Sequence, residues 1–216
     1  MTSQPATGRA PRRSARLVAA ALRTGRPSVD DAFDRFLPDA LREVSRHYWT
    51  PLPVVRKAAV WLRETRVRTV VDVGSGAGKF CVAAALLTRC RFIGVEHRSS
   101  LVAAARDLAE VFEVDDRASF MNGDLDTAGT FGADAYYFFN PFGAYDFEST
   151  RFADPDVTFT TDTQRRDIAA TAAMLSLAPI GTFVITYNGF GGTIPAGYEE
   201  IDRAARLPGT LRLWKK

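Results

Sequence analysis

At 216 residues, the chain is long enough for one domain of ordinary size and short for two. Hydrophobic residues make up 46% of it and charged residues 25%, which is the balance of a soluble globular protein. Arg, Asp or Glu interrupts every apolar stretch, so no segment reaches the roughly 18 to 20 apolar residues that a membrane span needs. The composition therefore argues against a membrane protein and predicts a cytoplasmic one.

Positive charge is concentrated at the start of the chain. Residues 1–29 contain six arginines and no acidic residue, which leaves 22 basic and 25 acidic residues in the remainder, a net charge of −3. By its net charge, the remainder is not expected to be a basic nucleic-acid binder. We expect residues 1–27 to form a basic, flexible arm that lies in solvent or touches nucleic acid or an acidic partner, and residues 28–216 to form a single domain.

Cysteine and histidine are scarce. Cys81 and Cys90 are the two cysteines, and His47 and His97 are the two histidines. These residues are too few and too far apart to predict a disulfide framework or a metal site. We expect both cysteines to be buried thiols.

Beyond residue 27, short apolar runs alternate with helical patterns, which is typical of βαβ units around a mostly parallel sheet. Residues 28–66 predict two helices, one from 29 to 45 with an interruption near Pro38 and one from 53 to about 66. Residues 67–216 predict the core, with strands over 69–73, 91–95, 118–122, 134–139 and 182–187, helices over 79–88, 100–112 and 163–177, an unpatterned stretch over 143–161, and a closing antiparallel hairpin over 198–205 and 210–214. The expected fold class is α/β, a doubly wound, mostly parallel seven-stranded sheet with helices on both faces.

A glycine-rich loop, Gly74-Ser75-Gly76-Ala77-Gly78, connects the first predicted strand to the helix after it. Such a turn brings backbone N–H groups and a helix N-terminus to one point, which suits a ligand with an anionic end. The phosphate-binding loop GxxxxGK[ST] is excluded because Val73 and Phe80 occupy its first and last positions. The dinucleotide fingerprint GxGxxG fits poorly because Lys79 stands where its third small residue belongs.

The segment from Val70 to Gly78, VVDVGSGAG, resembles motif I of the class I S-adenosylmethionine-dependent methyltransferases. The resemblance extends over about residues 49 to 214 and implies a Rossmann-like fold with S-adenosylmethionine as the cofactor. It implies that Glu96, 22 residues after Gly74, accepts the ribose hydroxyls, and that Asp124 lies beside the adenine amino group. The alternatives are an ordinary solvated carboxylate for Glu96 and the cap of a short turn for Asp124.

The same resemblance predicts direct contacts to the cofactor from Gly74, Ser75, Gly76 and Gly78. Asp72 lies in an apolar strand, and we expect it to act through a hydrogen bond to the glycine-loop backbone. Trp49-Thr50-Pro51 resembles the Thr-Pro element upstream of motif I in amino methyltransferases, where the threonine helps to hold the methionine carboxylate. Alternatively, or in addition, Thr50 is the N-cap of the following helix. Lys79 is expected to be a solvated side chain.

Asn140-Pro141-Phe142 follows the fourth predicted strand and resembles the [DNS]-P-P-[FYW] loop of amino methyltransferases with one proline missing. It is also similar to the corresponding loop of the histone-lysine methyltransferases that lack a SET domain. The resemblance implies that Asn140 faces the transferred methyl and accepts hydrogens from the target nitrogen, while Phe142 stacks on the flat group of the acceptor. We expect Pro141 to hold Asn140 in an extended conformation. The alternative is a rigid turn with Phe142 packed inside.

The sequence therefore predicts an S-adenosylmethionine-dependent methyltransferase that acts on an amino nitrogen of a protein or small molecule, without a metal. An oxygen acceptor would call for a general base or a metal, and no compelling base stands out in the sequence. Three alternatives stay open: a non-catalytic S-adenosylmethionine-binding regulatory module, a nucleic-acid N-methyltransferase that uses the basic N-terminal segment, and an NAD-dependent oxidoreductase, which Lys79 disfavours.

Overall fold

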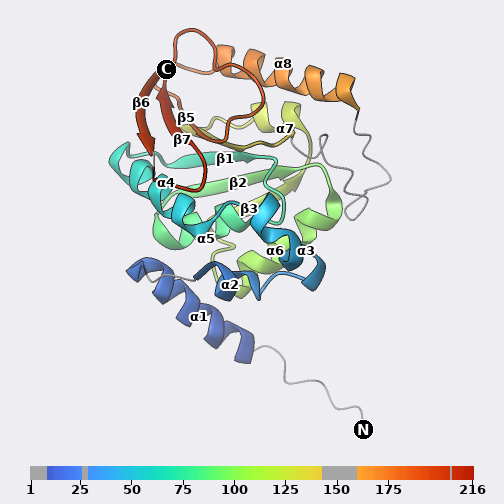
Figure 1. Ribbon diagram of the computed structural model, residues 1–216, viewed down its shortest axis with the longest axis vertical. Helices are drawn as coiled ribbons and strands as arrows, with labels where there is room; N and C mark the ends of the chain where they lie inside the picture. Colours follow the sequence, from blue (N-terminus) through green and yellow to red (C-terminus); the bar gives the residue numbers. More distant parts are fainter. Residues whose placement is uncertain (1–8, 26–28, 143–159, 205) are drawn as a thin grey trace.

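The computed structural model describes residues 9–25, 29–142, 160–204 and 206–216, so residues 143–159 of the unpatterned stretch 143–161 lie outside the described residues. A seven-stranded sheet in the order β3-β2-β1-β4-β5-β7-β6 runs through the centre of the molecule (Figure 1). Its strands are β1 (Thr69–Val73), β2 (Arg91–Glu96), β3 (Ala118–Asn122), β4 (Ala135–Phe139), β5 (Phe183–Tyr187), β6 (Glu199–Ala204) and β7 (Leu211–Lys215). The first five are parallel, and β7 runs antiparallel to both β5 and β6. The predicted fold class is confirmed.

The direction of strand addition reverses between β1 and β4. The chain moves outward from β1 to β2 and β3, then returns to β4 on the other side of β1 and continues to β5. In open α/β sheets, ligands bind at the carboxyl ends of the strands beside such a reversal. Because Val73 pairs with Phe138, the glycine loop after β1 and the Asn140 loop after β4 leave the sheet next to each other.

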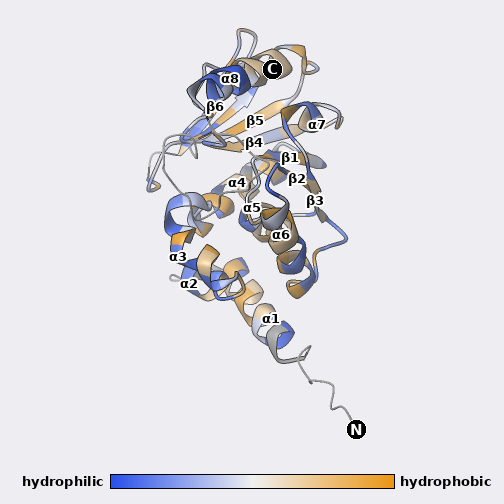
Figure 2. Cartoon of the chain, turned by 90° about the vertical axis from the view of Figure 1, so that its right-hand side faces the viewer, coloured by the Kyte–Doolittle hydropathy of each residue, from blue (hydrophilic) through white to orange (hydrophobic). Residues whose placement is uncertain are grey.

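Helices cover both faces of the sheet (Figures 1 and 2). One face carries α4 (Leu52–Glu64), α5 (Lys79–Leu87) and α6 (Ser99–Val111), and the other carries α7 (Leu125–Gly129) and α8 (Thr161–Leu177). Val70 packs in the core on the first face and Val71 in the core on the second, together with Leu175 of α8. This double coverage explains why β1 is an almost continuous apolar run rather than an alternating one.

Residues 9–24, which we expected to belong to a flexible arm, form the helix α1 (Arg9–Thr24), so that expectation is wrong for them. Ala15, Ala19 and Leu22 are buried on one face of α1, against α2 (Val29–Asp34), α5 and α6. Arg16 adds an ion pair to Glu113, with 2.8 Å between Nη2 and Oε1. Spacings of four and three residues bring the small apolar side chains onto one stripe, and their size lets the helix approach closely.

Other differences from the predicted elements are small. The helix expected over 29–45 is interrupted near Pro38, as predicted, but its second part, α3 (Asp39–Tyr48), ends three residues later than expected. The short helix α7 follows β3 where a turn was expected. Cys81 and Cys90 are buried free thiols, as expected. Among the described residues, no helix is both long and apolar enough to cross a membrane.

Candidate cofactor and acceptor site

The predicted cofactor residues gather in two small hollows on either side of the glycine loop. The first, which we call the Glu96 hollow, has a volume of about 70 Å³, and its lining includes Gly74, Glu96, Asp124, Pro141 and Phe142. The second, the Thr50 hollow, has a volume of about 20 Å³, and its lining includes Thr50, Asp72, Gly74, Ser75 and Tyr137. Gly74 lines both hollows, so both adjoin the glycine loop at the carboxyl edge of the parallel strands.

Side chains occupy much of the space beside the loop. A Cβ on Gly76 would overlap the Trp49 ring, and a Cβ on Gly74 would lie 2.7 Å from the Cβ of Pro141. Both glycines also have positive φ angles, +54° and +75°. The hollows are smaller than the roughly 300 to 1,000 Å³ of typical small-molecule pockets, so a bound cofactor requires neighbouring side chains to move.

The N–H groups of the glycine loop have partners within the protein. Gly74 and Ser75 both donate to the carbonyl oxygen of Val95, at 2.9 and 3.0 Å, and Gly76 donates to Oε2 of Glu96 at 3.0 Å. These three N–H groups are therefore not free for an anionic ligand, contrary to the expectation. Ser75 Oγ, by contrast, is buried without a hydrogen-bond partner among the described residues. An unused buried hydroxyl beside the loop fits a polar ligand at this position.

Glu96 is buried at the end of β2 and is not the solvated carboxylate of the alternative reading. Its Oε1 accepts from the backbone N–H of Arg98 at 3.1 Å and from Nε of the same arginine at 2.8 Å. Burial alone would raise the pKa of Glu96, but the charge and hydrogen bonds of Arg98, helped by His97, outweigh it and hold the pKa below its usual value. The carboxylate is thus ionised near neutral pH, the form that accepts two hydroxyl hydrogens.

Asp72 is buried within β1 and accepts a hydrogen bond from Sγ of Cys81 in α5 at 3.3 Å. We expected a bond to the glycine-loop backbone, and the structure instead links Asp72 to the helix that follows the loop. Loss of solvent raises the pKa of Asp72 to about 7; the Cys81 hydrogen bond opposes this shift and the charge of Glu96 adds to it.

Asp124 caps α7, which is the alternative weighed for this residue. Its Oδ1 accepts from the backbone N–H of Thr127 at 3.0 Å and from the hydroxyl of Thr127 at 3.1 Å. The backbone hydrogen bond from Thr127 is the main cause of a lowered pKa for Asp124. Because Asp124 also lines the Glu96 hollow, its contact with adenine stays a prediction.

Thr50 is buried beside the glycine loop, but it is not a helix N-cap. Helix α4 begins at Leu52 with Pro51 at the N-cap, and the backbone N–H of Leu52 donates to Oδ1 of Asp30 in α2 at 3.0 Å. The Thr50 hydroxyl instead lies 2.9 Å from the hydroxyl of Tyr137. The ring of Tyr137 stacks on Phe80 with 3.5 Å between ring centroids. Tyr137 was not singled out from the sequence, because an aromatic run along β4 does not reveal which ring reaches the loop.

Lys79 is 3% exposed, so the prediction of a solvated side chain is wrong. Its Nζ lies 2.8 Å from Oδ1 of Asp30, 2.8 Å from Oδ1 of Asp34 and 3.3 Å from the hydroxyl of Ser45. These partners belong to α2 and α3, whereas Lys79 is the first residue of α5. The ion pairs therefore tie the N-terminal helices, and with them Trp49 at the end of α3, to the glycine loop.

Asn140 is exposed and adopts a φ of +39°, so the expected extended conformation is wrong. Asparagine enters the left-handed region more readily than most residues, and a non-glycine residue held there is a frequent feature of functional sites. The Asn140 N–H donates to the carbonyl oxygen of Gly189 at 2.9 Å. Asn188, at the end of the neighbouring strand β5, has a φ of +57° and was not predicted.

Phe142 packs in the core on the α8 face and is 8% exposed. Its carbonyl oxygen accepts a hydrogen bond from Nε2 of Gln164 in α8 at 3.2 Å. These contacts favour the alternative of a rigid turn with the ring inside, and the stacking role of Phe142 stays a prediction.

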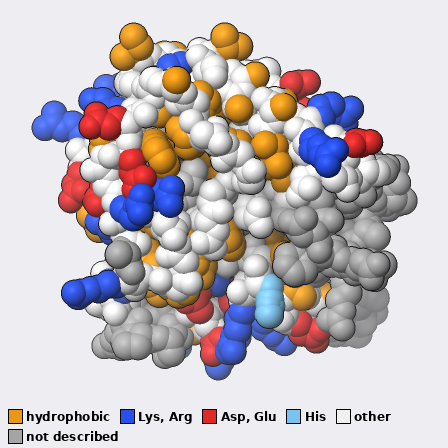
Figure 3. Space-filling model, turned by 45° about the horizontal axis from the view of Figure 1, so that its top comes forward, with side chains coloured by type: hydrophobic (Ala, Val, Ile, Leu, Met, Phe, Trp, Pro, Cys, Tyr) orange, Lys and Arg blue, Asp and Glu red, His pale blue; other side chains and the backbone are white. Residues whose placement is uncertain are grey.

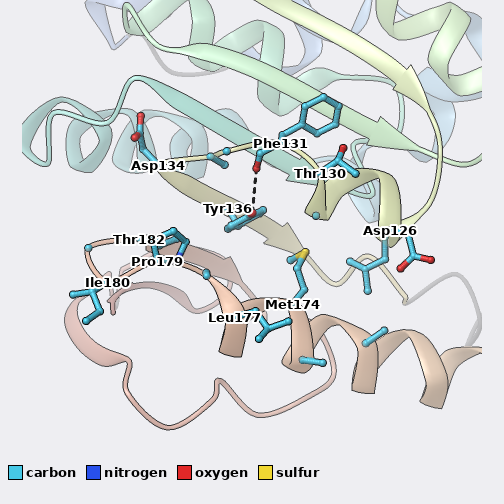
Figure 4. A pocket seen from close by; sticks show the side chains of 18 residues that line it. Asp126, Thr130, Phe131, Asp134, Tyr136, Met174, Leu177, Pro179, Ile180 and Thr182 are labelled. Atoms are coloured by element: carbon cyan, nitrogen blue, oxygen red, sulfur yellow. Dashed lines mark hydrogen bonds between the residues drawn. The ribbon is translucent and has the colours of Figure 1, made fainter.

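A much wider hollow, of about 840 Å³, lies between α7, α8 and the amino ends of β4 and β5 (Figure 4). The hydroxyl of Tyr136 donates to the carbonyl oxygen of Phe131 across one side of it, at 3.5 Å. None of the predicted site residues lines this hollow. Its position at the amino ends of the strands separates it from the glycine loop, so its size does not make it the cofactor site.

The chain resembles known proteins in structure but not in sequence. No family model and no curated protein matches the sequence. An RNA methyltransferase from Salinibacter ruber in complex with S-adenosyl-L-homocysteine superposes with a TM-score of 0.54 at 21% identity, over 77% of this chain and 92% of the other. A methyltransferase from Geobacter sulfurreducens gives 0.57 at 15% identity, over 85% and 94%. The mitomycin 7-O-methyltransferase MmcR gives 0.55 at 15% identity, over 92% and 60%.

The chain has the fold of a class I S-adenosylmethionine-dependent methyltransferase. Within this methyltransferase fold, the glycine loop and Glu96 stand at the carboxyl edge where the resemblance predicted them. Two of the compared proteins are named for different acceptors, RNA and mitomycin, so the shared fold does not identify the acceptor of this chain.

Proposed function

We propose that this chain is an S-adenosylmethionine-dependent methyltransferase that methylates an amino nitrogen of a protein or a small molecule. The observation that carries the proposal is the meeting of the glycine loop with the Asn140 loop, with Gly74 packed against Pro141 beside the buried carboxylate of Glu96. A cofactor loop and an acceptor loop in contact are what methyl transfer requires. The fold, shared with methyltransferases, supports the same reading.

Each part of the site suits one part of the cofactor. Glu96, ionised and at the end of β2, would accept the ribose hydroxyls in place of the hydrogen bonds that it now receives from the Arg98 side chain. The unused hydroxyl of Ser75 and the hydroxyl of Thr50 lie at the Thr50 hollow and would receive the methionine end. Asp124, at the Glu96 hollow, would lie beside adenine.

S-adenosylmethionine, when bound, supplies a methyl group already activated by its sulfonium. The protein therefore has mainly to align the lone pair of the acceptor, and such positioning is worth several kcal/mol. The exposed Asn140 would accept N–H hydrogens through its side-chain oxygen, while the bond from its backbone to Gly189 fixes the loop. A neutral amine needs no base on the protein because its proton is lost to water after transfer.

The experiment is transfer of a radiolabelled methyl group from S-adenosylmethionine into a fractionated cell lysate. We expect label in protein or in small molecules that survives mild alkali, which removes methyl esters but leaves N-methyl groups. Label in RNA or DNA would support the nucleic-acid alternative and contradict the proposed acceptor. Binding of S-adenosylhomocysteine without label in any fraction would support the non-catalytic module.

A further inference from the structure

A hollow of about 620 Å³ lies at the amino ends of β1 and β2, at the opposite edge of the sheet from the glycine loop. Five of the eleven residues that line it are arginines: Arg63, Arg66, Arg68, Arg89 and Arg91. All five side chains are exposed, and none of the lining residues is acidic. On the face shown in Figure 3, by contrast, Lys and Arg lie among Asp and Glu.

The positive charge of this arginine hollow is not neutralised by ion pairs. Among the described residues, no salt bridge involves the side chain of any of its five arginines. The nearby carboxylate of Asp134 accepts the backbone N–H groups of Arg68 and Thr69, both at 2.9 Å, and does not line the hollow. Five cations without acidic partners attract a polyanion.

Two further arginines, Arg23 and Arg117, lie behind the hollow, and Arg63 of its lining is held in the same way. Arg63 donates to the carbonyl oxygen of Leu87, in the last turn of α5, at 3.0 Å. Arg23 of α1 donates to the carbonyl oxygen of Leu86, in the same turn, at 3.1 Å. Arg117 donates to Thr88 O at 3.0 Å. Carbonyl oxygens hold these guanidinium groups in place without cancelling their charge, although Arg117 also pairs with the exposed carboxylate of Asp116, with 3.6 Å between Nε and Oδ2. The positive potential is therefore built on fixed elements.

Apolar side chains form the floor beneath the arginines. Leu62, Val67 and Leu86 line the hollow and are buried, and Leu87 is half-buried. A basic rim over an apolar floor suits a ligand that combines anionic groups with flat apolar ones, which describes unpaired nucleotides. The large hydrophobic side chains that stand exposed elsewhere do not line this hollow, so it lacks the apolar projections by which a protein enters a bilayer.

We infer that the arginine hollow binds single-stranded nucleic acid, with phosphates on Arg66, Arg89 and Arg91 and bases over the apolar floor. The site is distant from the glycine loop by the length of β1, about 17 Å for five residues, so it anchors the nucleic acid and takes no part in methyl transfer. The inference does not depend on the proposed acceptor. The net charge of −3 gave no sign of this site in the sequence, because a sum over the whole domain does not show a local group of arginines.

Fluorescence anisotropy with labelled single-stranded RNA and DNA oligonucleotides, without S-adenosylmethionine, tests the inference. The full chain with Arg66→Gln, Arg89→Gln and Arg91→Gln should bind either oligonucleotide about tenfold or more weakly than the unaltered protein. Its slope of log affinity against log salt should fall by up to about 2, because each phosphate contact on a single strand contributes about 0.7.

The matched control removes three arginines that already have carboxylate partners, through Arg42→Gln, Arg46→Gln and Arg165→Gln. It changes net charge equally and should leave affinity within about twofold. The single variant Arg89→Glu, at an exposed position, should weaken binding if the triple variant does not fold. Equal losses in both triple variants, or no binding by the unaltered protein, would overturn the inference. Tighter binding of a polyglutamate peptide or of phosphatidylserine vesicles through the same arginines would also overturn it.

Discussion

Gly74 and Pro141 are in contact, so that a Cβ added to Gly74 would lie 2.7 Å from the Cβ of Pro141. One residue belongs to the loop after β1 and the other to the loop after β4. The contact joins the predicted cofactor loop to the predicted acceptor loop, and glycine is the residue that permits it. The two loops therefore pack directly against each other at this point.

Gly74→Ala should therefore force the loops apart. The left-handed backbone, with φ of +75°, costs alanine about 1 to 2 kcal/mol, and the clash with Pro141 adds to it. We expect affinity for S-adenosylhomocysteine to fall roughly tenfold or more, as measured by calorimetry. Gly132→Ala is the control, since a Cβ there has no atom within 4 Å. Equal affinities for both variants would show that the contact is unimportant.

Asn140→Ala should abolish methyl transfer while leaving the affinity for S-adenosylhomocysteine nearly unchanged. The side-chain oxygen would be lost, whereas the bond from the Asn140 N–H to Gly189 O would still hold the loop against the roughly 1 to 2 kcal/mol that a left-handed backbone costs alanine. We expect turnover to fall by about a hundredfold or more, the scale of a lost hydrogen bond in a transition state. Radiolabelled transfer measures turnover, and calorimetry measures binding. Unchanged turnover would remove Asn140 from the proposed mechanism.

Lys79→Met should destabilise the fold, because it leaves the buried carboxylate of Asp34 without its cation. Breaking a buried ion pair in this way costs about 3 to 5 kcal/mol of unfolding free energy, which urea denaturation measures. Adding Asp34→Asn to Lys79→Met should recover part of the loss. Lys57→Met removes a half-exposed pair with Asp202 and should cost less than about 1 kcal/mol. Similar losses for the two lysine variants would contradict the assigned role of Lys79.

Asp72 should make the protein less stable as the pH rises. Its pKa is raised to about 7 in the folded protein, so between an ordinary carboxyl value and about 7 the folded state holds a proton that the unfolded state has released. Unfolding free energy then falls with increasing pH, by at most about 1.4 kcal/mol per pH unit. Asp72→Asn removes this pH-dependent loss of stability. The unfolding free energy of the variant minus that of the unaltered protein should therefore increase from pH 4 to 7 and then level off. A constant difference between Asp72→Asn and the unaltered protein would show that Asp72 does not titrate in this window.

The central strands β1, β4 and β5 could be predicted because each is a local apolar run. Val70, Val71 and Val73 identify β1 without knowledge of any partner, and the turn at Gly74 follows directly. The same holds for the site residues at strand ends, such as Glu96. Parallel topology then brings those ends to one edge.

The environment of individual side chains could not be predicted in the same way. The burial of Lys79 depends on Asp30 and Asp34, which lie 49 and 45 residues earlier in the chain. The arginines of α1 led to the prediction of a flexible arm, although the spacing of Ala15, Ala19 and Leu22 is typical of a helix with one buried face. The left-handed turn at Asn140 is accompanied by a bond to Gly189 in a neighbouring loop, a distant partner of which the local preference set by proline gives no sign.

The most direct measurement is calorimetric titration of the unaltered protein and of Glu96→Gln with S-adenosylhomocysteine, with NAD as the comparison ligand. We predict binding of S-adenosylhomocysteine by the unaltered protein, at least about tenfold weaker binding by Glu96→Gln because a neutral amide is a poorer acceptor for two hydroxyls, and no binding of NAD. Binding of NAD in place of S-adenosylhomocysteine, or equal affinity in the Glu96 variant, would contradict the proposed cofactor site.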